Sequence, residues 1–171
     1  MKEVFLITLA TLGIILPTTA YVFWFKNICG YYPHSYSDTF KGWIKKFGVG
    51  FRFQCWIVFA NLFMAFGLYE YSTTWYEYLL GFGAMFYLGL VALYPSGINS
   101  EITKLHCIFA KLCAGSAVVW LLCKELYILT GSLILIGLVW SYFKKEYETL
   151  IMEAMAFLGV YIGIILLSLG L

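Results

Sequence analysis

The chain has 171 residues, of which 63% are hydrophobic and 12% are charged, and its formal net charge is +2. A soluble domain needs roughly 25% charged residues to keep its surface in water, so this composition excludes a soluble globule with a polar shell. The small net charge also argues against a strongly basic surface, and we expect no nucleic-acid partner. The mean hydropathy of +0.87 predicts an all-α, polytopic transmembrane helical bundle that forms a single domain over residues 1–171.

Six apolar stretches predict the membrane-spanning helices, because a helix needs about 20 apolar residues to cross a bilayer. In chain order they cover residues 4–25, 51–69, 75–94, 102–123, 126–143 and 150–171. The first stretch contains Pro17, which we expect to free a backbone carbonyl and to kink the helix. A secretory signal peptide also begins with an apolar run. Here the run continues through Phe25, so we interpret it as a retained first helix.

The long connection at residues 26–50 contains a helix of a different kind. Apolar residues recur there at i, i+3, i+4 and i+7, and this spacing predicts an amphipathic helix over residues 37–47. The apolar residues of this pattern are Phe40, Trp43, Ile44 and Phe47.

The basic residues of this predicted helix lie off its apolar face, and two interpretations remain open. The helix either lies on the membrane surface or packs on the bundle as an ordinary loop helix. In the first case its contacts with the membrane surface or with a partner protein would come from Lys41, Lys45, Lys46 and Trp43.

The distribution of Lys and Arg predicts the orientation, because cytoplasmic loops carry an excess of both. One side receives Lys2 and Lys124. The other receives Lys26, Lys41, Lys45, Lys46, Arg52, Lys104, Lys144 and Lys145. We therefore expect residues 26–50 to be cytoplasmic in an integral protein of a bacterial inner (plasma) membrane, with both termini outside.

A matched set of charges within two predicted helices indicates a polar site. Lys104 and Lys111 are seven residues apart on one helix, and Glu146 and Glu153 are seven apart on another that enters from the same side. Lys111 and Glu153 should therefore lie at similar depth, about 10 Å beyond the entry points. An unpaired charge there costs several kcal/mol, so we expect a Lys111–Glu153 ion pair. Either this pair lines a cavity for a headgroup, ion or proton, or Lys111 snorkels and Glu153 makes a capped contact that stabilises the bundle.

His106 is the third candidate of this polar site. It is a proton-sensitive group or headgroup contact in one interpretation, and an interfacial histidine hydrogen-bonded to a neighbour in the other. No catalytic residue is predicted, because the sequence holds no catalytic motif and thus does not favour an enzyme. Five cysteines and two histidines without ligand spacing predict neither a metal site nor a disulfide framework, and no cofactor is expected.

Other polar residues receive simpler interpretations. Asn61, alone within an apolar helix, predicts a helix–helix hydrogen bond. Four charges gather at the opposite membrane face, where we expect them to be solvated or to line an external vestibule. They are Glu70, Glu77, Lys124 and Glu125.

One further pattern resembles a known family. The third predicted helix ends in Tyr94-Pro95, and a short polar turn leads to His106, with Ala110 one turn on. This resembles the small six-helix proteins of the DRAM (damage-regulated autophagy modulator) group and their bacterial relatives. There, an aromatic–Pro pair ends helix three and a His opens helix four. The resemblance implies a six-helix bundle and a role in lipid handling. Those relatives usually have the first loop outside, contrary to the basic-residue distribution.

These observations lead to three functional hypotheses. The first is a membrane protein that binds or handles a lipid or small amphiphile in the bundle, with membrane lipids as partners. The second is a small channel or transporter, as a homo-oligomer. The third is a membrane subunit or effector that acts through a protein partner.

Overall fold

The computed structural model describes all residues 1–171, and its regular elements are all helices. Five helical spans are long and apolar enough to cross a membrane, namely Lys2–Cys29, Phe51–Tyr71 (α4), Trp75–Leu93 (α5), Ser100–Cys123 (α6) and Lys145–Ser168. The predicted all-α membrane-protein fold is therefore confirmed. A sixth apolar helix, α7 (Tyr127–Phe143), has 17 residues. It is about 25 Å long, a little shorter than a hydrocarbon core of about 30 Å.

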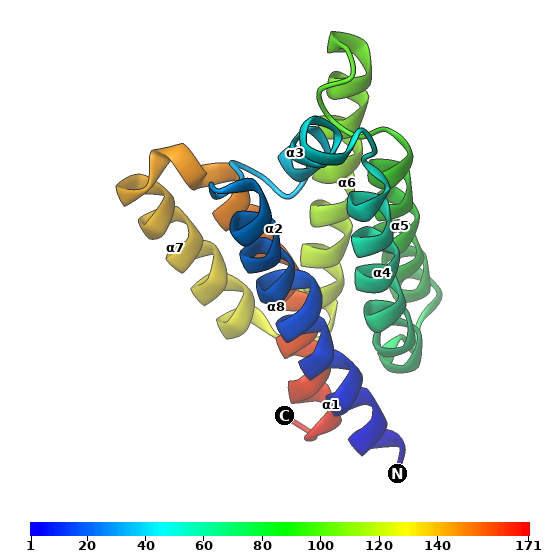
Figure 1. Cartoon of the computed structure of the whole chain (residues 1–171). Coiled ribbons are helices and arrows are strands. Elements are labelled where there is room, and N and C mark those ends of the chain that lie inside the picture. Colours follow the sequence, from blue (N-terminus) through cyan, green and yellow to red (C-terminus); the bar gives the residue numbers. More distant parts are fainter.

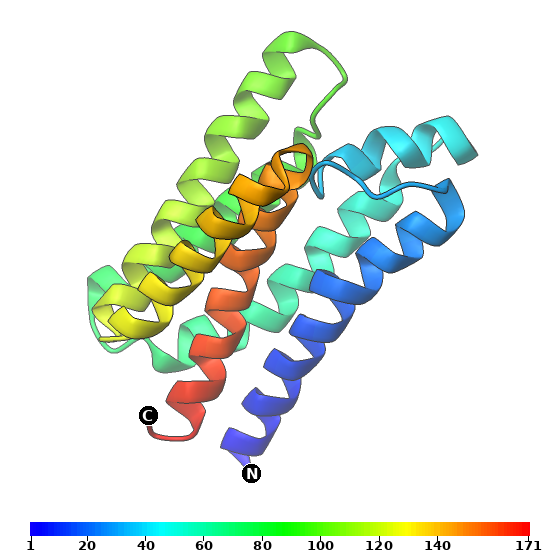
Figure 2. The ribbon, with the colours of Figure 1, turned by 90° about the vertical axis from the view of Figure 1, so that its left-hand side faces the viewer.

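The helices form an antiparallel bundle around α8 (Glu148–Ser168), which continues from the short helix η2 (Lys145–Tyr147). Helix α8 packs against α1 (Lys2–Gly13), α4, α6 and α7. Helices α4, α5 and α6 follow one another side by side, whereas α7 lies at the outer edge of the bundle (Figures 1 and 2). Both chain termini lie at the same end of the molecule.

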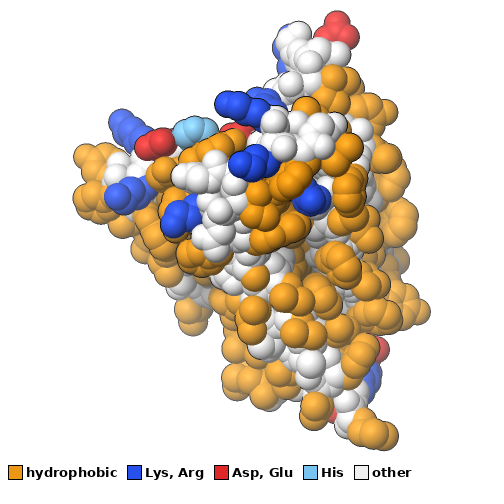
Figure 3. All heavy atoms as spheres, in the orientation of Figure 1, with side chains coloured by type: hydrophobic (Ala, Val, Ile, Leu, Met, Phe, Trp, Pro, Cys, Tyr) orange, Lys and Arg blue, Asp and Glu red, His pale blue; other side chains and the backbone are white.

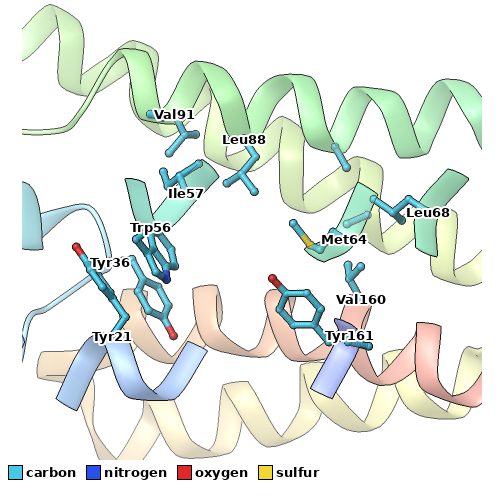
Figure 4. Packing of buried hydrophobic residues seen from close by; sticks show 14 of the residues in the cluster. Tyr21, Tyr36, Trp56, Ile57, Met64, Leu68, Leu88, Val91, Val160 and Tyr161 are labelled. Atoms are coloured by element: carbon cyan, nitrogen blue, oxygen red, sulfur yellow. The ribbon is translucent and has the colours of Figure 1, made fainter. Parts of the chain in front are cut away.

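The core is built where aromatic side chains meet small residues. Tyr161 of α8 is fully buried and donates a hydrogen bond to the carbonyl of Ala60 over 3.1 Å. Its ring lies directly against Gly13, where even a methyl side chain would overlap the ring. Small residues let membrane helices approach closely in this way. Figure 4 shows Tyr161 beside Met64 and Val160, between α8 and α4.

Pro17 interrupts the first helix without ending it. Helix α1 passes into a π-helical segment, η1 (Ile14–Ala20), and then into α2 (Tyr21–Cys29). A proline has no N–H to donate to the preceding turn, so the local ladder must widen. The buried carbonyl of Gly13 accepts a hydrogen bond from the Thr18 hydroxyl over 3.2 Å.

Helix α3 (Asp38–Phe47) crosses the end of the bundle and is anchored by its apolar face. The interpretation of Trp43 as a membrane-surface or partner contact is wrong, because its side chain is fully buried. Its ring packs edge-on against Phe25 with centroids 5.1 Å apart. This anchor leaves Lys45 and Lys46 exposed. The helix is therefore packed on the bundle through part of its apolar face, while Ile44 and Phe47 remain exposed and a basic edge faces the surroundings.

Candidate functional site

A buried cluster of rings and hydroxyls joins η1, α2, α3 and α4. The Tyr21 hydroxyl is 2.7 Å from Thr39 Oγ1 and accepts a hydrogen bond from the Trp43 indole N–H over 3.0 Å. The Trp56 indole N–H donates to the carbonyl of Pro17. We call Tyr21, Tyr36, Thr39, Trp43 and Trp56 the aromatic cluster.

Tyr36 brings the connecting loop into this cluster. Its hydroxyl donates to the carbonyl of Thr18 in η1 over 2.6 Å, and its ring stacks on Trp56 with centroids 4.5 Å apart at 11°. Tyr21 also stacks on Trp56, at 5.0 Å and 17°, and Figure 4 shows the three rings together. Burial, and secondarily the charge of Glu153, raises the pKa of Tyr36 far above its usual value. Its hydroxyl therefore stays protonated and remains a hydrogen-bond donor.

An open groove of about 530 Å³ runs beside the cluster, between the first helix and α4. Apolar and aromatic side chains make up most of its wall, and we call it the α2–α4 groove. Its lining residues are Leu16, Pro17, Ala20, Tyr21, Trp24, Phe51, Arg52, Cys55, Trp56, Phe59 and Phe63.

Arg52 is the only charged residue that lines the groove. Its guanidinium lies over the ring of Phe47 at 3.9 Å and over that of Trp43 at 5.1 Å. No carboxylate lies within ion-pair distance, and Nη1 is buried without a hydrogen-bond partner. Rings thus pack against its faces, while at least one of its five donors is unused.

The structure does not form the predicted Lys111–Glu153 ion pair, so that prediction is wrong. Glu153 Oε2 instead accepts a hydrogen bond from the backbone N–H of Tyr36 over 2.8 Å. Lys111 is exposed on the outer surface of α6 and has no carboxylate partner. Depth along a helix follows from residue counting, but rotation about its axis depends on packing. Here packing turns the two side chains toward different surroundings.

His106 is buried, with 3% of its surface exposed, and it makes the hydrogen bond to a neighbour that the second interpretation predicted. Its Nδ1 lies 2.9 Å from the carbonyl of Tyr94, so the ring ties the start of α6 to the end of α5. No hydrogen bond or ion pair joins any two of His106, Lys111 and Glu153. The three predicted site residues are therefore distributed among separate contacts.

At the opposite end of the bundle, two of the four charges that were expected to be solvated form a buried ion pair. Lys124 Nζ lies 2.6 Å from Glu77 Oε2, and their side chains are only 9% and 5% exposed. The same oxygen accepts from the backbone N–H of Thr73 over 2.6 Å and from that of Thr74 over 3.1 Å. This contact joins the α4–α5 turn to the end of α6.

Asn61 makes the predicted helix–helix contact, donating from Nδ2 to the carbonyl of Met85 on α5 over 3.1 Å. No three His, Cys, Asp or Glu side chains lie close enough together to hold a metal ion.

Sequence reasoning missed the groove and the role of Arg52, which it counted only toward the orientation. The available sign was an arginine one residue inside an apolar helix, flanked by Phe51 and Phe53. The groove itself could not be inferred, because its walls come from segments more than 25 residues apart, such as those of Ala20 and Cys55.

Comparisons with known proteins add no family to these observations. No family model matches the chain, and no curated protein or solved structure matches it either. The resemblance to the DRAM group therefore stays a prediction. On its structure, the chain is an all-helical protein whose long apolar helices embed it in a membrane.

Proposed function

We propose that this protein binds an acyl chain of a membrane lipid in the α2–α4 groove. The observation that carries the proposal is the groove itself, about 530 Å³ in volume and lined almost wholly by apolar and aromatic side chains. Small-molecule sites are typically roughly 300–1,000 Å³ and largely apolar. Phe51, Cys55 and Phe59 are exposed along the groove, so it opens on the perimeter of the bundle, where lipid chains are the surroundings.

The packing behind the groove favours a fixed shape. Trp56, which lines it, is stacked between Tyr21 and Tyr36. The π-helical carbonyls of Pro17 and Thr18 accept hydrogen bonds from Trp56 and Tyr36. These acceptors are thus satisfied inside the protein, as the absence of water in a bilayer requires. A preformed apolar wall lowers the cost of ordering the site when a chain binds.

Filling the groove should reduce lipid binding. Ala20 lines it and is exposed, so in Ala20→Trp an indole would occupy the space of the bound chain without disturbing the core. We expect the purified variant to retain at least about fivefold less phospholipid, counted by native mass spectrometry, which corresponds to a loss of about 1 kcal/mol of affinity.

The matched control for this experiment is Thr19→Trp. Thr19 is exposed on the same turn but does not line the groove, so its lipid content should equal that of the wild type. Equal lipid retention by Ala20→Trp and Thr19→Trp would contradict the proposed function.

The basic end of the molecule supports a cytoplasmic position for residues 26–50 in a bacterial inner membrane. Figure 3 shows Lys and Arg side chains gathered around α3, above a largely hydrophobic body. An excess of basic residues marks the cytoplasmic side. We therefore expect alkaline phosphatase fused after Leu171 to be active in the periplasm, because the C-terminus lies at the end opposite α3. An inactive fusion, with a fluorescent-protein fusion active at the same site, would reverse this orientation.

A further inference from the structure

The position of Arg52 along the groove matches the position of a lipid headgroup relative to its chain. Arg52 lies at the start of α4, beneath α3, and the groove continues along α4 to Phe63. The step of eleven residues from Arg52 to Phe63 spans about 16 Å of helix. This is close to the hydrocarbon thickness of one leaflet, which is half of about 30 Å. A chain in the groove would therefore place its polar group beside Arg52.

The guanidinium is arranged to bind an oxyanion through its edge. Phe47 and Trp43 pack against it, 3.9 Å and 5.1 Å from the ring centroids to the Arg52 carbon Cζ. Its Nη1 is enclosed by protein atoms and donates to none of them, so the phosphate would be bound through the other N–H groups of this partly exposed side chain in the groove wall. Arginine edges match the oxygens of a phosphate in bidentate geometry, whereas a buried donor left unpaired is costly.

The charge around Arg52 favours a headgroup with a net negative charge. Arg52 has no carboxylate within ion-pair distance, and the single acidic residue of α3, Asp38, is paired with Lys41 at 3.6 Å. Lys46 lies on the exposed edge of α3, whose rings pack against Arg52, and it adds positive charge to this end of the molecule. A zwitterionic headgroup would bring its own ammonium group toward these cations, and an anionic one would not.

From these contacts we infer that the lipid of the α2–α4 groove is an anionic phospholipid, whose phosphate is bound by Arg52. The inference rests on the proposed function, because it assigns a headgroup to the chain that the groove holds.

Native mass spectrometry of the protein in an equimolar mixture of dioleoyl phosphatidylglycerol and dioleoyl phosphatidylcholine tests the inference. We expect the wild type to retain at least about fivefold more phosphatidylglycerol than phosphatidylcholine, and Arg52→Gln to lose this preference. Lys104→Gln removes a charge from an exposed position on α6 outside the groove, so it should keep the preference. Arg52→Lys, which retains the charge without the planar edge, should be intermediate and serves if the glutamine variant does not fold.

The possible outcomes separate the two proposals. Equal retention of both lipids by the wild type, with retention still reduced by Ala20→Trp, would overturn the anionic headgroup and leave the chain-binding groove. Equal retention with no effect of Ala20→Trp would overturn both. Binding of inorganic phosphate that depends on Arg52 but is unchanged in Ala20→Trp would identify a site for free anions, and would overturn the lipid assignment.

Discussion

Replacing Glu77 with glutamine is expected to lower the free energy of unfolding by about 3–5 kcal/mol, the usual cost of removing one partner from a buried ion pair. Lys124 Nζ lies 2.6 Å from Glu77 Oε2, and both side chains are nearly inaccessible. In Glu77→Gln the Lys124 ammonium would remain buried without a counter-charge. The glutamine oxygen can still accept from the Thr73 and Thr74 N–H groups, so the loss reports mainly on the charge.

Unfolding by SDS in mixed micelles, followed by circular dichroism, measures this change. The control is Glu125→Gln, an exposed acid next to Lys124 without an ion pair, which should cost less than about 0.5 kcal/mol. The double variant Glu77→Leu/Lys124→Met should be more stable than Glu77→Gln, because it leaves no unpaired buried charge. A loss in Glu77→Gln no larger than that in Glu125→Gln would show that solvent screens the pair.

The second large effect is expected at Tyr36, which is 2% exposed although it belongs to a connecting loop. Tyr36→Ala removes the ring stacked on Trp56 and leaves a cavity among η1, α4 and α8, so we expect a loss of about 3–5 kcal/mol. Tyr36→Phe keeps the ring and removes only the hydrogen bond to the Thr18 carbonyl. Its expected cost is about 1–3 kcal/mol, because that carbonyl would lose a buried partner.

The same unfolding experiment separates these two contributions. Tyr32→Ala changes another tyrosine of the loop, which is 38% exposed, and we expect it to cost about 1 kcal/mol or less. Because Trp56 lines the groove, Tyr36→Ala should also lower phospholipid retention, whereas Tyr32→Ala should not. Equal stability losses in Tyr36→Ala and Tyr32→Ala would mean that the loop is not held in the bundle by Tyr36.

The sequence by itself was sufficient to place the helices, because a bilayer demands long apolar segments with all backbone hydrogen bonds made internally. Helices α4 and α5 begin at the predicted residues 51 and 75, and α3 ends at the predicted Phe47. Pro17 predicted an interruption of the regular hydrogen bonding in the first helix, because proline has no N–H wherever it stands. The hydrogen bond of Asn61 to a neighbouring helix was predictable in the same way, because a polar side chain within an apolar helix needs a hydrogen-bond partner.

The tertiary structure alone decided which side chains meet. Residue counting gave Lys111 and Glu153 a similar depth. The rotation of α6 and α8 about their axes, however, leaves Lys111 exposed on the outer surface and directs Glu153 to the backbone N–H of Tyr36. Amphipathic spacing placed Trp43 on an apolar face without telling whether lipid or protein covers each of its side chains; the bundle covers Trp43 and leaves Ile44 and Phe47 exposed. The Glu77–Lys124 pair and the α2–α4 groove depend likewise on segments distant in sequence. The spacing of residues in the sequence determines where each side chain lies along its helix. Which side chain of another helix it meets depends on how all the helices pack together.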